Sequence, residues 1–331
     1  MASNKSAFVD DKGKPLRIAD SAMPKPGADD IVVRNHAVAI NTIDPAQADG
    51  FLIKQYPTVL GHDLAGEVFD VGSNVKRFKK GDRVIGHARQ FLTGQPEDGA
   101  FSLYSRVPAG NAAILPDRFE YKQGVVLPLA IDTAACGFYE EGYMQLELPS
   151  LDAKPNGRVV VVYGGSSSVG IAAIQLAVNA GYRVIATSSS KNSNLCREAG
   201  ASEVFDYKAE SIAGDIAKAV GDDQFVGLFN AIGIPESFDV VNPIMEKLNG
   251  GFLANTKPPG KLPSFIDAKF VLCIGDFGFP VWENFITKAL ESGKLKCLPE
   301  PKVVGKGLDS LQEAFEVRNG EVSAQKVVVE L

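Results

Sequence analysis

The sequence predicts two domains, a β-rich barrel-like one followed by an α/β one with a doubly wound parallel sheet. The chain has 331 residues, more than one hydrophobic core usually serves. Its first third reads as short alternating strands separated by turn signals, and its second half alternates strand and helix patterns. The predicted domains are 1–125 and 126–275, and we expect the segment 276–331 to return to the first domain.

Turn signals separate the strand patterns of the first domain. They stand at Pro24-Lys25-Pro26-Gly27, at Gly72-Ser73-Asn74 and at Gly81-Asp82. Gly, Pro, Asn and Asp are the residues that tight turns favour. Short strands joined by such turns predict an antiparallel, barrel-like sheet.

The second domain has a continuous β-branched run at 158–163. Such runs are typical of parallel strands that are buried on both faces. After it, helical and extended patterns alternate, which predicts a doubly wound arrangement. Predicted helices are 169–179, 192–199, 211–220, 237–248, 282–291 and 308–319, and predicted strands are 183–186, 204–206, 225–230, 252–254, 270–274 and 327–330.

Composition and charge exclude several classes of protein. Hydrophobic residues make up 45% and charged residues 22%, which is typical of a globular chain. The net charge of -6 attracts neither nucleic acid nor anionic lipid, so we expect neither partner. There is no run of about 18 apolar residues and no apolar leader, so we expect a cytoplasmic protein. The four cysteines form no C-x-x-C pair, which argues against a disulfide framework or a structural zinc site.

A glycine-rich turn joins the strand 158–163 to the helix 169–179. It reads Tyr163-Gly164-Gly165-Ser166-Ser167-Ser168-Val169-Gly170, in the strand–turn–helix context of a dinucleotide site. Gly164 permits the tight turn, and Gly170 lets the helix approach the sheet. Ser167 stands where the usual pattern has glycine, so we expect serine hydroxyls to add hydrogen bonds to the pyrophosphate. A strand-to-helix turn without a ligand is the alternative.

The end of the next strand favours NADPH over NADH. An NAD site would place Asp or Glu there for the ribose diol, whereas residues 186–192 offer hydroxyls and Lys191. Hydroxyls and a cation suit a 2′-phosphate. Tyr207 follows the third strand and can close over that phosphate. The alternatives are a solvated lysine and a half-buried core tyrosine.

The N-terminal signature is Pro57-x-x-x-Gly61-His62-Asp63-x-x-Gly66-x-Val68, followed by Gly81-Asp82-x-Val84. Because of this signature, the chain resembles the medium-chain dehydrogenase/reductase superfamily, and the resemblance extends over essentially its whole length. The segments 39–44, 127–130 and 163–166 resemble its zinc-independent branch, near quinone oxidoreductases and fungal trans-enoyl reductases. The resemblance implies a Rossmann doubly wound sheet plus a GroES-like barrel.

The metal-ligand positions of the zinc alcohol dehydrogenases are altered here. Where that family has Cys, His and Cys, this chain has Asn41, His62 and a position near Leu129. One histidine cannot make a three-ligand site, so we expect no metal. His62 is then a structural histidine, and His36 and His87 have no supporting pattern.

Without a Lewis acid, the implied reaction is hydride transfer from NADPH to the β-carbon of an activated C=C bond. The implied substrate is an enoyl thioester, an enone or a polyketide intermediate. The catalytic candidates are Asn41, Lys54 and Tyr56, of which the last two can deliver a proton. A quinone oxidoreductase and a non-catalytic NADPH-binding protein are the alternatives.

The resemblance implies cofactor contacts from loops of both domains. They are Asp44, Pro45 and Ala46 beside the nicotinamide; Gly164, Gly165, Ser166, Ser167, Ser168 and Val169 at the pyrophosphate; Ser189, Ser190, Lys191, Asn192 and Tyr207 at the adenosine phosphate; and Thr133, Ile232, Gly233, Val322 and Ser323 elsewhere along the cofactor.

The sequence says less about the substrate and the partners than about the cofactor. Aromatic residues can line an apolar cleft or simply fill the core. We expect a small-molecule substrate and, for carrier-bound chains, a carrier protein or polyketide synthase as partner. Monomer and homodimer both stay open, with strand 270–274 as a pairing edge for a dimer. The candidate aromatic residues are Phe51, Tyr56, Tyr139, Tyr143, Phe277 and Phe279.

Overall fold

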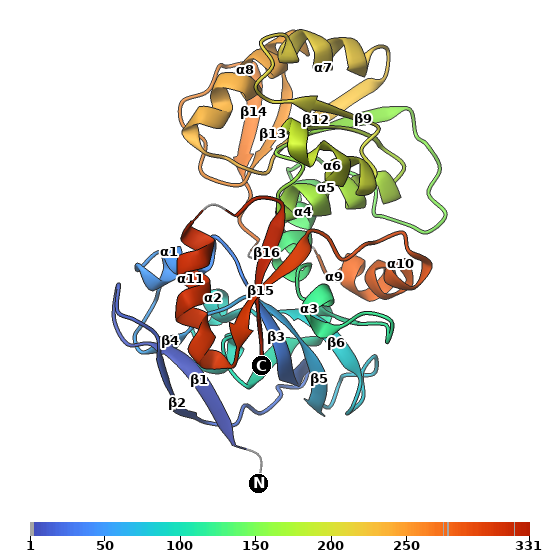
Figure 1. Ribbon diagram of the computed structural model, residues 1–331. Helices are drawn as coiled ribbons and strands as arrows, with labels where there is room; N and C mark the ends of the chain where they lie inside the picture. The colour runs from blue at the N-terminus through green and yellow to red at the C-terminus, as the bar shows by residue number, and fades with distance from the viewer. Residues whose placement is uncertain (1–2, 274, 277, 321) are drawn as a thin grey trace. The chain divides into compact units, whose positions relative to one another are not determined.

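The computed structural model describes residues 3–273, 275–276, 278–320 and 322–331. The chain divides into two compact units, which we name unit 1 (1–129 with 300–331) and unit 2 (130–299). Figure 1 shows the elements of both. The expected fold class, a barrel-like β domain with a doubly wound parallel sheet, is confirmed.

Unit 1 is built on a seven-stranded sheet in the order β15-β16-β3-β5-β6-β8, with β7 also paired to β3. A three-stranded sheet, β2-β1-β4, accompanies it. The strands are β1 (Asn4–Val9), β2 (Arg17–Ser21), β3 (Asp30–Ile40), β4 (Thr58–Val59), β5 (Asp63–Val71), β6 (Arg83–His87), β7 (Tyr104–Pro108), β8 (Ala112–Ile114), β15 (Glu300–Lys306) and β16 (Gln325–Glu330).

The last strand of the chain completes unit 1. β16 pairs antiparallel with β3, with Val327 opposite Ile40, and Figure 1 shows the two side by side although they come from opposite ends of the chain. Val327 and Val329 alternate into the same buried apolar cluster as Val38 and Ile40. The helices of this unit are α1 (Ile43–Ala48), α2 (Gln90–Thr93), α3 (Tyr121–Gly124) and α11 (Leu311–Asn319).

Unit 2 contains a six-stranded sheet in the order β11-β10-β9-β12-β13-β14. Every pairing in it is parallel. The central β9 is the β-branched run, and all but its first residue are buried, as a strand covered on both faces requires. The strands are β9 (Arg158–Tyr163), β10 (Arg183–Ser188), β11 (Glu203–Asp206), β12 (Gln224–Asn230), β13 (Gly251–Asn255) and β14 (Ile266–Phe270).

The helices of unit 2 follow the predicted alternation. They are α5 (Ser168–Asn179), α6 (Ser193–Glu198), α7 (Ile212–Val220) and α8 (Phe238–Lys247), with α4 (Pro128–Tyr139) entering from unit 1 and α9 (Phe279–Val281) and α10 (Thr287–Ser292) at the end. Among the described residues, no helix is long and apolar enough to cross a membrane. Cys136, Cys196, Cys273 and Cys297 are free thiols.

In the C-terminal half one strand was predicted in the wrong place and another was not predicted. The strand expected at 270–274 is β14, Ile266–Phe270; residues 271–273 lie outside any strand, and Ile274 lies outside the described residues. β14 is an edge strand with alternating burial, so its half-polar sequence resembles a loop more than the apolar run that follows it. β15, which is also largely exposed, was not predicted.

Residues 278–299 belong to unit 2, so its boundary differs from the predicted one at 275. Trp282 is completely buried, and its indole Nε1 donates a hydrogen bond to Asp132 Oδ1 at 2.6 Å. Lys296 N–H donates to Gln175 Oε1 at 2.7 Å. A buried indole needs an acceptor, and Asp132 on α4 supplies it within this unit.

Candidate active site

The glycine-rich turn has the strand–turn–helix geometry expected of it. Gly164 has φ +77°, and a Cβ there would lie 2.4 Å from Ile232 Cγ1. At Gly170 a Cβ would lie 2.3 Å from the carbonyl oxygen of Gly164. Both positions therefore require glycine, the first for its backbone conformation and the second for close approach of α5.

The hydroxyl of Ser167 caps α5, which differs from the expectation that it faces a pyrophosphate. It accepts a hydrogen bond from Gly170 N–H at 3.1 Å and donates to the Gly164 carbonyl at 2.8 Å. Its donor is thus already engaged in the turn. Serine is a favoured N-cap residue for this reason.

Backbone N–H groups remain available at this turn. Gly164 and Gly165 donate to Thr187 at 3.1 and 2.8 Å. In the part of the chain that the structure describes, no hydrogen bond uses the N–H groups of Ser166, Ser168 and Val169. They stand at the N-terminus of a 12-residue helix, where the helix dipole also favours negative charge. This donor set fits a pyrophosphate.

The second loop of the site follows β10 and contains the predicted phosphate-binding residues 189–192. Lys191 is exposed. Tyr207 is half-buried and packs against the apolar cluster of unit 2, with its ring centroid 6.4 Å from that of Tyr163. Its N–H donates to the Ser188 carbonyl at 3.2 Å, which ties the ends of β10 and β11 together.

A carboxylate that the sequence analysis missed lies at this loop. Asp206 Oδ2 accepts hydrogen bonds from Ser190 N–H at 3.2 Å and from the Ser190 hydroxyl, and Oδ1 accepts from Lys208 N–H at 2.9 Å. These bonds, the Ser190 hydroxyl first, hold the pKa of Asp206 below its usual value. The parallel pairing of β10 and β11 sets Ser188 beside Asp206 and so brings the carboxylate to this loop.

The remaining predicted residues of unit 2 lie on two further elements. Gly233 has φ +64°, and Asn230 Oδ1 accepts hydrogen bonds from the N–H groups of Ile232 and Gly233 at 3.2 and 3.0 Å. Thr133 is half-buried on α4, with Oγ1 3.9 Å from Cys273 Sγ. The loops after β9, β10, β11 and β12 all meet the carboxyl edge of one parallel sheet, where such folds bind ligands.

In unit 1 a buried ammonium lies between Asn41 and Asp63. Lys326 Nζ is 2.8 Å from Asp63 Oδ2 and also donates to Asn41 Oδ1. Asn41 Nδ2 donates to Asp63 Oδ2 at 2.8 Å, and Leu129 N–H donates to Asp63 Oδ1 at 2.6 Å. The two non-histidine positions that the resemblance aligns with metal ligands thus bind a carboxylate instead. The amide of Asn41 is engaged at both ends.

His62 belongs to a buried chain of polar side chains with Gln47 and His87. Its Nε2 is 2.9 Å from Gln47 Oε1, and its Nδ1 is 3.3 Å from His87 Nε2. Because an amide oxygen only accepts, Nε2 of His62 carries the hydrogen and Nδ1 accepts. Burial lowers the pKa of His62 well below its usual value. His87, for which no role was expected, is the partner of His62.

The described residues contain no group of three or more His, Cys, Asp or Glu that could hold a metal ion.

Asp44 is a completely buried acid of unit 1. Its Oδ2 accepts Asn41 N–H at 2.6 Å, and its Oδ1 lies 3.9 Å from His62 Nε2 without a hydrogen bond. Burial, with a smaller contribution from Asp63, raises the pKa of Asp44 to about 8. Asp44 and Pro45 are buried, and Ala46 is exposed. The carboxyl group of Asp44 lies close to Asn41 and His62, and its expected position beside the nicotinamide stays a prediction.

The proton-donor candidates lie on one loop of unit 1. Lys54 is exposed and its ammonium donates to the Leu92 carbonyl. Tyr56 is half-buried against the apolar cluster. Among the other aromatic candidates, Phe51 is exposed, whereas the Tyr143 hydroxyl donates to the Phe270 carbonyl at 2.6 Å. Phe277 lies outside the described residues.

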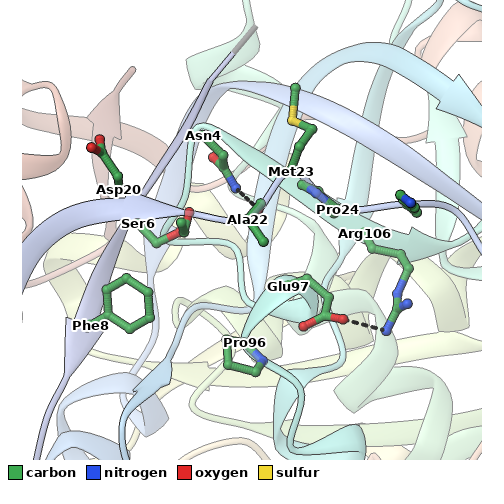
Figure 2. A pocket seen from close by; sticks show the side chains of 12 residues that line it. Asn4, Ser6, Phe8, Asp20, Ala22, Met23, Pro24, Pro96, Glu97 and Arg106 are labelled. Atoms are coloured by element: carbon green, nitrogen blue, oxygen red, sulfur yellow. Dashed lines mark hydrogen bonds and ion pairs between the residues drawn. The ribbon is translucent and has the colours of Figure 1, made fainter.

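Unit 1 has a hollow of about 570 Å³ between the β1–β2 hairpin and the short helix Pro96–Asp98. Figure 2 shows the side chains that line it. Asn4 Nδ2 donates to the Ala22 carbonyl at 3.2 Å, and Arg106 pairs with Glu97 at 3.7 Å. None of the predicted site residues lines it. Three of its polar side chains, Asn4, Glu97 and Arg106, bind other groups of unit 1.

Comparison with known proteins assigns the chain to a family. A sequence profile described as Alcohol dehydrogenase GroES-like domain matches residues 27–117, and one described as Zinc-binding dehydrogenase matches residues 168–247. Dehydrogenase orsE of Emericella nidulans is 44% identical over 348 residues, covering 100% of both chains. Trans-enoyl reductase himH of Aspergillus japonicus is 37% identical over 310 residues, covering 91% of this chain and 90% of that one.

The fold comparison agrees. The solved structure of mycobacterial Rv1454c complexed with NADPH aligns with a TM-score of 0.74 at 21% identity, over 99% of this chain and 100% of that one, and solved quinone oxidoreductases share the fold. This chain belongs to the medium-chain dehydrogenase/reductase superfamily and is an oxidoreductase of it.

Proposed function

We propose that this protein is a zinc-independent, NADPH-dependent reductase that transfers hydride to the β-carbon of an activated C=C bond. The observation that carries the proposal is the buried Lys326 ammonium between Asn41 and Asp63. An ammonium and a backbone N–H cannot ligate a metal, and an amide is not among the usual ligands of zinc. Without a Lewis acid to polarise an alcohol or ketone, a substrate that is already electrophilic at carbon is the better match.

The cofactor site rests on unit 2. The N–H groups of Ser166, Ser168 and Val169 would hold the pyrophosphate, because they are directed donors at a helix N-terminus. Residues 189–192 with Tyr207 would hold the adenosine 2′-phosphate. When bound, NADPH supplies the hydride. The contacts expected from residues 44–46, 133, 232–233 and 322–323 stay predictions.

The roles of the catalytic candidates are refined by their contacts. We propose Tyr56 and Lys54 as proton donors to the α-carbon; the Lys54 ammonium donates one hydrogen bond to the Leu92 carbonyl and has further N–H donors. Asn41 is better assigned to positioning, since both ends of its amide bind Asp63 and Lys326. The negative charge that forms on the substrate carbonyl needs a donor, which backbone N–H groups or a cofactor hydroxyl can provide.

The substrate is a small molecule, an enoyl thioester, an enone or a polyketide intermediate. If it is carrier-bound, a carrier protein or polyketide synthase is the implied partner. We propose a cytoplasmic location, in keeping with the four free thiols.

Parallel assays test the proposal. NADPH consumption is measured with a small enone, an enoyl thioester and a quinone, with NADH as control and products identified by mass. Saturated product from either alkene is expected. Turnover of the quinone alone would instead make the protein a quinone oxidoreductase. Binding of NADPH without turnover of any of the three would favour a non-catalytic NADPH-binding protein.

A further inference from the structure

The carboxylate of Asp206 occupies the loop that the proposed function assigns to the 2′-phosphate. It is the last residue of β11, and Ser190 on the neighbouring loop gives it both its N–H and its hydroxyl. Ser190 has a single O–H donor. While this contact persists, the Ser190 hydroxyl cannot donate to a phosphate.

The charges around Asp206 are mixed. Lys208 donates its backbone N–H to Oδ1, and its ammonium lies 5.8 Å from the centroid of the Tyr207 ring, so it leans over that ring. Lys191 is exposed on the adjoining turn. A 2′-phosphate would meet two lysines and one carboxylate here, whereas a ribose diol would find in the same carboxylate a hydrogen-bond acceptor.

We infer that Asp206 is a specificity-determining residue that lowers the preference for the 2′-phosphate, both by its charge and by engaging the Ser190 hydroxyl. The inference rests on the proposed cofactor site in unit 2. Lys191 and Asp206 then act in opposite directions at one phosphate position. We therefore expect this pair of side chains to set the ratio of NADPH to NADH affinity.

Asp206→Asn tests the charge. The amide oxygen can still accept from Ser190 N–H, so the connection between the strand ends is kept while the negative charge is removed. Asp222→Asn is the matched control, because Asp222 is exposed just before β12, at the amino end of the strands. Dissociation constants are measured for NADPH, NADH, 2′,5′-ADP and 5′-AMP at low ionic strength.

We expect Asp206→Asn to raise the NADPH-to-NADH affinity ratio about fivefold, a gain that shrinks in high salt, as for any exposed charge pair. The 2′,5′-ADP-to-5′-AMP ratio should move with it, and Asp222→Asn should leave both ratios unchanged. A purely structural Asp206 would weaken all four ligands equally, and this result or an unchanged ratio overturns the inference.

A double-mutant cycle tests the hydroxyl. Ser190→Ala should change NADPH affinity less in the wild-type background than in Asp206→Ala, where the hydroxyl is released. Equal effects in both backgrounds would show that Asp206 does not withhold the hydroxyl.

The experiments can contradict the proposed function and this inference independently of each other. A wild-type protein that prefers NADH contradicts the assignment to NADPH, yet a shift of the ratio toward NADPH in Asp206→Asn would still support the role of Asp206.

Discussion

The polar groups of the two units are organised in opposite ways. In unit 1, Asp44 is completely buried, and burial raises its pKa to about 8. In unit 2, Asp206 is partly exposed, and hydrogen bonds lower its pKa. The first carboxyl group is therefore mainly neutral at pH 7 and the second is charged. Unit 1 therefore has a buried polar network whose stability depends on every partner. Unit 2 has exposed charged residues at the carboxyl edge of its sheet, where they can contact a ligand.

The largest effect is expected from Lys326→Met. It removes the ammonium that lies against Asp63 and leaves a buried carboxylate without its counter-charge, which typically costs about 3–5 kcal/mol. Thermal or urea unfolding measures the loss. Lys302→Met, at an exposed lysine of the neighbouring strand β15, is the control and should change stability by less than about 0.5 kcal/mol. Similar losses in both variants would contradict the buried pair.

Asp44→Asn should make the folded state less sensitive to pH. The folded pKa of Asp44, about 8, lies above its usual 3.8, so the unfolded chain releases this proton first as the pH rises. Burial of Asp44 therefore destabilises the fold increasingly between these two values. We expect the stability difference between variant and wild type to grow by up to about 3 kcal/mol from pH 5 to pH 7. Urea unfolding at several pH values measures it, and a constant difference would argue against a protonated Asp44.

Gly170→Ala probes the close approach of α5 to the turn. The added Cβ would lie 2.3 Å from the Gly164 carbonyl oxygen, and overpacking of this kind costs about 1–3 kcal/mol. Gly214→Ala is the matched control in α7, where a Cβ would meet nothing within 4 Å; it should stabilise by roughly 0.4–1 kcal/mol. Gly170→Val should go further and abolish NADPH binding or folding. Unchanged NADPH affinity in Gly170→Val would contradict the proposal that the cofactor binds at this turn.

The smallest effect concerns the open edge of unit 2. Lys191→Glu should weaken NADPH about tenfold relative to NADH, because a carboxylate replaces a cation near the proposed 2′-phosphate. Fluorescence titration with both cofactors measures it. Lys218→Glu, on the exposed side of α7, serves as the control. An equal loss of affinity for NADPH and NADH would contradict the proposal that Lys191 contacts the 2′-phosphate.

Local patterns predicted much of unit 2. The helix 169–179 and the strand 225–230 match α5 and β12 closely, because strand and helix periodicity are written in neighbouring residues. β14 and β15 were misplaced or missed, since an exposed edge strand lacks the apolar run that marks a buried one.

In the candidate site, too, features formed by neighbouring residues were predicted and features formed by distant residues were missed. The glycines of the turn were found because a strand, a turn and a helix follow one another in the chain. Ser167 was assigned to a ligand, but its hydroxyl caps α5. Asp206 and Lys326 were missed because their partners, Ser190 and Asn41, lie 16 and 285 residues away.

By itself, the sequence determined the alternation of strands and helices in unit 2, the glycine-rich turn and the change in the metal-ligand positions, because each depends on residue types at short spacing. Only the tertiary structure decided where each polar group finds its partner. It put an ammonium beside Asp63, neutralised Asp44 by burial and brought Asp206 to Ser190. Burial and hydrogen-bond geometry arise from contacts between distant segments, and they set the charge that each group carries.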